Sequence, residues 1–158
     1  MSSRPPMPPK LFEDPEAALN EAIAALPSYE ATTDNIRIVV RAFWLDDQSQ
    51  PDEHSYCWGY RIRIENHGPN TVQLLERSWE IIDANGHIDR VRGEGVVGEQ
   101  PILEPGGGFE YTSGASLDTP SGIMRGFFHM VEEPGRRLFD VRIPAFSLDS
   151  PYQPSMLH

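Results

Sequence analysis

From residue 36 onward, apolar side chains recur at every second position. One run places Ile36, Ile38, Val40, Ala42 and Trp44 on the same side of an extended chain, and the next does so with Tyr56, Trp58, Tyr60, Ile62 and Ile64. Successive side chains of a β-strand point to opposite faces, so a period of two is typical of a strand with one buried face. The pattern therefore predicts a fold built from strands that each bury one face.

Turn residues divide the rest of the chain into short segments of the same kind. Further strands are expected at residues 71–83, 87–92, 108–113, 123–131 and 138–148. The apolar phase within 71–83 slips once, which predicts a β-bulge. Asn85-Gly86 predicts a type I′ hairpin turn. Seven or eight antiparallel strands at this spacing predict an all-β sandwich.

The segment before the first of these strands differs in pattern from the rest. Residues 1–13 carry four prolines and few apolar side chains, which predicts a mobile tail. A short helix is expected at 15–26, with Asp14 as its N-cap and Pro15 at its first position. Leu19, Ile23 and Leu26 share the helix face that we expect to lie against the main body or another chain. We therefore predict an extension at 1–34, a domain at 35–150 and a C-terminal tail at 151–158.

Length and charge limit the possible partners. A chain of 158 residues has the size of one domain, and its 24 acidic and 13 basic residues give a net charge of −11. A negative average field repels phosphate backbones, so nucleic acid is not an expected partner. No apolar run is long enough to cross a membrane and the N-terminus lacks the apolar stretch of a secretion signal, so we expect no membrane span and a cytoplasmic location. The lone cysteine, Cys57, agrees with that location.

Several separated motifs resemble the ApaG domain family, in the right order along the chain. They are residues 60–66, 72–75, 77–79, 81–83 with Gly86, 93–106, 109–114, 117–124 and 143–148. The resemblance covers roughly residues 35–150, and the extension at 1–34 departs from the simplest bacterial members. It implies a β-sandwich of the immunoglobulin or fibronectin type III kind, in agreement with the strand pattern.

The resemblance also carries expectations about function. Bacterial members are linked to cobalt and magnesium tolerance or efflux, and their gene often lies beside that of a diadenosine tetraphosphate hydrolase. In eukaryotes the domain occurs in an F-box protein and in a polymerase-delta-interacting protein, where it resembles a protein-binding module. The family offers no agreed catalytic residues, so the resemblance implies none here.

Residues 93–98 match the glycine pattern of dinucleotide-binding loops, with Gly93, Gly95 and Gly98 at the required spacing. We call this segment the glycine loop. A Rossmann site needs a helix to begin at the glycines, and Pro101 and Pro105 argue against one. Consecutive N–H groups can still bind an anion without a helix, and the candidate site comprises Arg90, Arg92, Gly93, Glu94, Gly95 and Gly98. The alternative is that the glycines only supply tight turns.

The sequence offers little for metal binding or catalysis. The five histidines are scattered, and no His-x-His or Cys-x-x-Cys spacing occurs, so we expect no metal ligands and no cofactor. The acidic residues Asp46, Asp47, Asp52 and Glu53 are typical of a solvated loop. Ser113, Ser116 and Ser121 lie near Asp118 and His129 in sequence, without the Gly-x-Ser-x-Gly turn of many hydrolases. We therefore expect no enzyme, with a phosphoanhydride hydrolase as the distant alternative.

The aromatic pair Phe127-Phe128 is informative because neighbouring residues of a strand face opposite ways. One ring must lie outside the core, where the helix or a second subunit would cover it. Our first hypothesis is a non-catalytic module that binds a protein partner through an open sheet edge or an outer apolar face. The alternative is a binder of pyrophosphate or a dinucleotide polyphosphate at the glycine loop. A homodimer is also expected, because open sandwiches have edges to bury.

Overall fold

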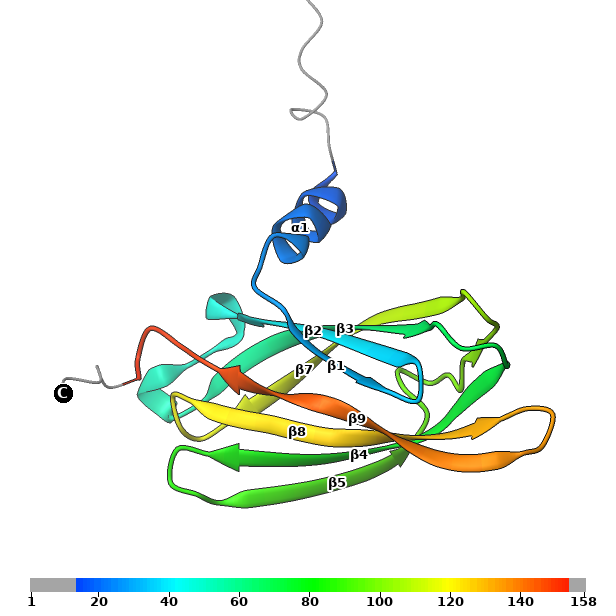
Figure 1. Cartoon of the computed structure of the whole chain (residues 1–158). Helices are drawn as coiled ribbons and strands as arrows, with labels where there is room; N and C mark the ends of the chain where they lie inside the picture. The colour runs from blue at the N-terminus through cyan, green and yellow to red at the C-terminus, as the bar shows by residue number, and fades with distance from the viewer. Residues whose placement is uncertain (1–13, 154–158) are drawn as a thin grey trace, which may run out of the picture.

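The computed structural model describes residues 14–153 and shows two antiparallel sheets stacked face to face (Figure 1). The predicted mobile tail at 1–13 and the part of the C-terminal tail at 154–158 lie outside the described residues. The first sheet has the strand order β1-β2-β3-β7, and the second has the order β5-β4-β8-β9 with β6 paired to β4. Strand β1 lies beside β9, so the two layers meet along that side.

The predicted strands are present with small differences in their bounds. The elements are α1 Pro15–Ala24, β1 Tyr29–Thr33, β2 Ile36–Trp44, β3 Tyr56–Asn66, β4 Val72–Asp83, β5 Ile88–Glu94, β6 Ile102–Leu103, β7 Gly108–Leu117, β8 Gly122–Glu132 and β9 Arg137–Leu148, with 3-10 turns at Asp46–Gln48 and Pro51–Glu53. The all-β sandwich is therefore confirmed. Its β4–β8 register shifts between Leu74 and Glu76, which confirms the predicted bulge.

The described chain has nine strands, of which β1 and β6 were not predicted. Most of β1 is exposed, and it belongs to the first sheet although it lies within the predicted extension. An exposed edge strand needs no alternating apolar residues, so its sequence carries no strand signal. Strand β6 is only Ile102–Leu103, too short to show any period.

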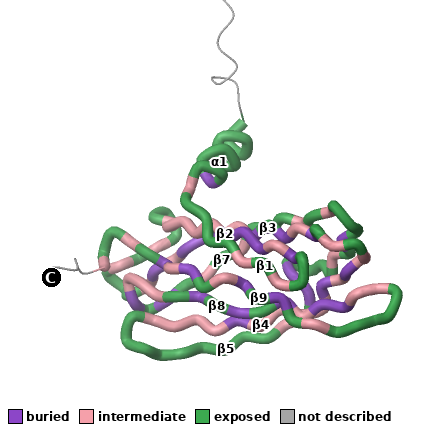
Figure 2. The backbone as a smooth tube through the Cα atoms, viewed as in Figure 1, coloured by how far each residue is buried: buried purple, intermediate pink, exposed green. Residues whose placement is uncertain are grey.

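The core consists of the side chains that alternate inward from both sheets. Ile38, Ile62 and Ile64 of the first sheet and Leu74, Phe128 and Ile143 of the second are all fully buried. Figure 2 shows this buried layer between strands whose other residues are intermediate or exposed. Phe128 is fully buried and Phe127 is 44% exposed, so one ring of this pair lies outside the core, as expected. The side of each sheet that faces away from the core is its outer face.

The hairpin at Asn85-Gly86 is present, but its predicted turn type is wrong. A type I′ turn needs a positive φ at both central residues. Here only Gly86 has one, at 85°, and Ala84, Asn85 and Gly86 together connect Asp83 to His87. The Asp83 carboxylate explains the change, because its Oδ1 accepts hydrogen bonds from the N–H groups of Asn85 and His87, both at 2.9 Å.

Helix α1 begins where the sequence predicts, because Asp14 Oδ1 accepts a hydrogen bond from the Ala17 N–H at 2.6 Å. It contacts β2 and points away from the sandwich (Figure 1). Ile23 is buried, whereas Leu19 is 52% exposed, so the predicted apolar face is only partly covered. The helix lies on the side of the first sheet and leaves Phe127 of the second sheet exposed.

The opposite burial of Phe127 and Phe128 gives a matched test of the fold. We expect Phe128→Ala to lower the free energy of unfolding by about 3–5 kcal/mol, because it removes a buried ring and leaves a cavity. Phe127→Ala should change it by only about 0.5 kcal/mol. Urea unfolding of both variants checks this, and equal losses would show that the two rings are not on opposite faces.

Candidate functional site

Four strands place one row of side chains across the outer face of the second sheet. Ser78 on β4 is paired with Arg92 on β5 and with Phe127 on β8. Phe127 is paired in turn with Arg142 on β9. Directly opposed residues on one face of a sheet lie about 5 Å apart, so these four side chains are neighbours.

The next row along the sheet consists of Arg90, Glu80 and Arg125, in that order across β5, β4 and β8. Glu80 accepts one hydrogen bond from each arginine, at 2.8 Å from Arg125 and 2.9 Å from Arg90. These bonds, above all that from Arg125, lower the pKa of the Glu80 carboxyl. One carboxylate is therefore shared by two guanidinium groups.

The two rows border an open pocket of about 590 Å³, which we call the arginine pocket. The lining includes Ser78, Arg90, Arg92, Arg125, Phe127 and Arg142. Within residues 14–153, the Arg142 side chain has no hydrogen-bond or ion-pair partner, in contrast to Arg90, Arg92 and Arg125. A volume of this size is ordinary for a small-molecule site.

Sequence reasoning found only part of this pocket. It selected Arg90 and Arg92 for their closeness to the glycine loop, and it identified one ring of the Phe127-Phe128 pair as lying outside the core. It missed Ser78, Arg125 and Arg142, which come from three other segments. Alternation assigns each residue to a face, but only the strand order and register bring these segments together.

A chain of hydrogen bonds joins Ser78 of the first row to His129 and Asp140, which are paired across β8 and β9. The Ser78 Oγ lies 2.6 Å from His129 Nε2, and His129 Nδ1 lies 2.7 Å from Asp140 Oδ1. These are the residue types of a hydrolase triad, but β4 is paired on both sides at Ser78, which commits the local N–H groups to the sheet. An oxyanion hole needs free N–H donors, and those around Ser78 are used by the sheet. The hydrogen bonds from Ser78 to His129 and Asp140 instead fix the positions of these side chains beside the pocket.

The serines considered from sequence lie elsewhere. Ser113 and Ser116 are on β7 of the first sheet, and Ser121 lies before β8. The hydrogen-bond partners of His129 are Ser78 and Asp140, each separated from it by many residues in sequence. The structure therefore does not bring His129 together with the serines that sequence proximity had indicated.

The glycine loop is a hairpin, and no helix begins among these described residues. Val96 and Glu99 form a tight turn by donating N–H hydrogen bonds to each other's carbonyl oxygens, at 2.8 and 2.9 Å. Gly95 donates its N–H to the Leu75 carbonyl at 2.8 Å. Two N–H groups of the loop, those of Gly95 and Val96, are thus bonded within the chain, as is that of Glu99 just after it.

Backbone conformation and close packing explain why glycine occupies these positions of the loop. Gly95 has φ 63°, and a Cβ there would collide with the Glu99 carbonyl. Gly98 has φ 81° in the turn. A side chain on Gly93 would meet the Arg77 guanidinium, which donates to the Gly95 carbonyl at 2.8 Å. These positions favour the interpretation of the glycines as turn and packing residues.

Of the predicted anion site, Arg92, Gly93 and Glu94 line a second cavity of about 480 Å³ beside Glu76. Glu76 accepts a hydrogen bond from Arg92 at 2.8 Å, which lowers the pKa of its carboxyl. Arg90 lines the arginine pocket instead. The predicted residues are therefore divided between two cavities and a hairpin. Anion binding at the glycine loop stays a prediction.

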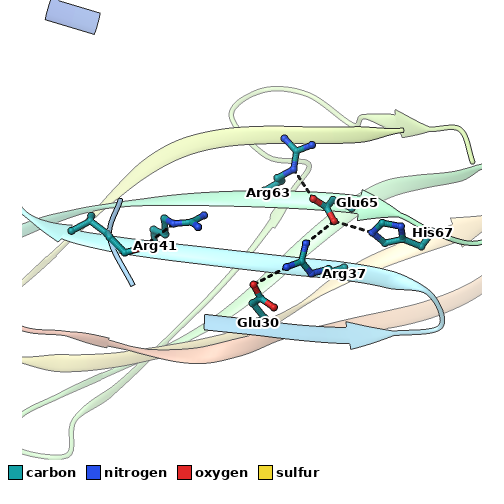
Figure 3. Close-up of polar contacts among 7 residues, drawn as sticks. Glu30, Arg37, Arg41, Arg63, Glu65 and His67 are labelled. Atoms are coloured by element: carbon teal, nitrogen blue, oxygen red, sulfur yellow. Dashed lines mark hydrogen bonds and ion pairs between the residues drawn. The ribbon is translucent and has the colours of Figure 1, made fainter. Parts of the chain in front are cut away.

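The outer face of the first sheet carries a contrasting group of charges, shown in Figure 3. Glu65 accepts hydrogen bonds from Arg63 at 2.7 Å and Arg37 at 2.9 Å, and it lies 2.8 Å from His67. Arg37 also binds Glu30 at 2.7 Å. The bonds from Arg63 and His67 are the main causes that lower the pKa of Glu65 to about 2. Here the charged groups pair with one another.

Residues 14–153 contain neither a membrane-spanning helix nor a group of metal ligands. No helix in that range is long and apolar enough to cross a membrane. No three His, Cys, Asp or Glu side chains in the same range are grouped as ligands for one metal ion.

Comparison with known proteins identifies the family. The family model of the ApaG domain matches residues 46–132. The protein ApaG of Paramagnetospirillum magneticum is 54% identical over 130 residues, which cover 82% of this chain and 99% of that protein. The chain belongs to the ApaG family. The protein ApaG of Parvibaculum lavamentivorans is 55% identical over the same shares of both chains.

A solved ApaG-like structure agrees with the fold. The crystal structure of the protein named ApaA from Bordetella pertussis superposes with a TM-score of 0.71 at 39% identity, covering 81% of this chain and 98% of that one. The resemblance to the ApaG family, drawn from separated motifs, is thereby confirmed together with the sandwich. The domain bounds of 35–150 stay a prediction. Strand β1, which lies within the predicted extension, pairs with β2 in the first sheet.

The lowered pKa of Glu65 predicts a pH-dependent stability. An ionised Glu65 stabilises the fold above its ordinary pKa of 4.5, and this stabilisation is lost as the pH falls toward about 2. We expect Glu65→Gln to lower the free energy of unfolding at pH 7 by about 1 kcal/mol, since exposed partners are screened by solvent. Below pH 4.5 the difference from the unaltered chain should shrink.

Urea unfolding at pH 7 and pH 3 measures this difference. Glu110→Gln is the matched control, because that carboxylate is 44% exposed and lies 4.0 Å from Arg63. Its effect should stay within about 0.5 kcal/mol at both pH values. A Glu65 variant with the same small effect would contradict a stabilising role for these ion pairs.

Proposed function

We propose that this ApaG-family chain is a non-catalytic interaction module that binds a protein partner through the outer face of its second sheet. The observation that carries the proposal is the exposed ring of Phe127, which lies in the middle of that face between Ser78 and Arg142. Covering a large apolar side chain that is exposed at the centre of a sheet lowers the free energy, which favours binding of a partner there.

Apolar residues extend the surface beyond Phe127. Ile88, Ile82 and Ile123 form a row across β5, β4 and β8, and Ile88 and Ile123 are 39% and 46% exposed. The row is adjacent to that of Arg90, Glu80 and Arg125 in the register of the sheet. Aromatic residues and arginine are enriched at protein interfaces, where they supply most of the binding energy. The mixture supports a protein-binding surface.

The charges indicate which partner would fit. Four arginines surround the pocket on a chain whose net charge is −11. A partner that presents carboxylates beside an apolar side chain matches this local positive field and the exposed ring. We therefore propose an acidic protein segment as the partner, met in the cytosol.

The family's link with cobalt and magnesium tolerance enters the proposal through that partner. A surface that presents Phe127, Ile123 and arginines is suited to protein contact, so the partner would be the component that handles the ion. Self-association through the same face is the other form of the proposal. It would give a symmetric dimer in which each copy covers the Phe127 ring of the other.

Partner capture with matched variants tests the proposed surface. We expect the tagged protein to retain a specific partner from lysate, and Phe127→Asp to reduce that retention at least tenfold by placing a charge at the centre of the face. Ile102→Asp is the control, because this residue is 64% exposed on β6 and does not line the pocket. Equal retention by Phe127→Asp and Ile102→Asp would contradict the proposal.

A further inference from the structure

The arginine pocket has a local excess of positive charge. Its lining contains four guanidinium groups and one carboxylate, that of Glu80. The next carboxylate, that of Glu76, is bonded to Arg92. Asp140 also acts electrostatically on Arg92, so with three carboxylates counted the guanidinium groups exceed them by one. Such an excess on a chain of net charge −11 favours an anionic ligand at this place.

Arg142 is the group best placed to bind that anion. Its backbone N–H is bonded to Thr33 Oγ1 at 3.2 Å, but no described residue accepts a hydrogen bond from its side chain. A guanidinium group presents its donors as a planar fork that matches the oxygen atoms of a phosphate group. The cross-strand neighbour of Arg142 is Phe127, so charge and apolar surface lie side by side.

The remaining walls indicate the rest of the ligand. Phe127 is 44% exposed and provides apolar contact within the cavity. Ser78 adds a hydroxyl group whose position is held by His129 at 2.6 Å. The cavity volume of about 590 Å³ exceeds what a bare inorganic ion requires. A ligand with a flat apolar body would therefore fill it better.

We propose that the arginine pocket is a binding site for a small phosphate monoester with a flat apolar body. The phosphate would bind to the fork of Arg142, with support from Arg125 on the adjacent strand β8. The apolar body would pack on the ring of Phe127. The inference concerns a small molecule bound by the isolated chain, and it does not depend on the protein partner proposed above.

The proposed phosphate position at Arg142 is separate from the glycine loop. Arg142 lies on β9, which β8 and β4 separate from β5 and from the loop that follows it. A ligand held by Arg142 and Phe127 is therefore distinguishable by mutation from one held at Gly95 and Gly98. This separation makes Arg142 the residue to change.

Titration calorimetry with 1-naphthyl phosphate tests the site on the purified full-length chain. We expect saturable binding of one molecule per chain at submillimolar concentration. 1-Naphthol, which lacks the phosphate, and inorganic phosphate, which lacks the ring, should each bind at least tenfold more weakly. Equal binding of inorganic phosphate and the naphthyl ester would overturn the assignment of an apolar subsite, and no binding of the ester would overturn the site.

Three variants locate the binding. Arg142→Gln should weaken 1-naphthyl phosphate at least tenfold, because it removes a guanidinium group that has no other partner among the described residues. Arg61→Gln is the matched control, since it removes the same charge from β3 of the first sheet. Phe127→Ala should weaken the ester but leave the affinity for inorganic phosphate unchanged. Equal losses with Arg142→Gln and Arg61→Gln would overturn the site.

The outcomes separate this inference from the proposed function. Absence of naphthyl phosphate binding, together with partner loss in Phe127→Asp, would refute the ligand site and leave the interaction module standing. Binding that depends on Arg142, with partner retention unaffected by Phe127→Asp, would establish the ligand site and refute the interaction surface. Circular dichroism of each variant before titration confirms that it is folded.

Discussion

The packing of β8 against the first sheet determines which way the outer side chains point. Phe128 is fully buried between the sheets, and a strand cannot bury one residue without directing its neighbour to the other face. Phe127 is therefore held outward, as are Arg125 and His129 at alternate positions. A slip of one residue would expose Phe128 and bury charged groups, so core packing and the outer surface depend on the same register.

The two outer faces use their arginines differently. On the first sheet, Glu65 is bonded to Arg37 and Arg63, and the charges there are largely paired with one another. On the second sheet, Glu80 is shared by Arg90 and Arg125, while the Arg142 side chain has no partner among residues 14–153. Paired exposed charges contribute little to binding, whereas an excess of guanidinium groups beside an exposed ring attracts an anion. This contrast favours the outer face of the second sheet as the surface that binds an anion.

The sequence predicted what is decided by local alternation and missed what is decided by contacts between distant strands. The inward residues of β3, the bulge in β4 and the opposite faces of Phe127 and Phe128 all follow from a period of two. The sequence did not predict β1, because an exposed edge strand needs no apolar pattern. The turn at Gly86 differs from the predicted type because the Asp83 carboxylate accepts hydrogen bonds within it. Arg142 joins Arg92 only through the register of four strands, which no single segment encodes.

Both proposals require that the outer face of the second sheet is the surface that binds. Two-dimensional NMR of the labelled chain during titration with 1-naphthyl phosphate measures this residue by residue. The account predicts that the largest amide shifts occur at Ser78, Phe127 and Arg142 and decline toward the first sheet. Shifts confined to Gly95 and Gly98, or centred on Glu65 of the opposite face, would contradict it.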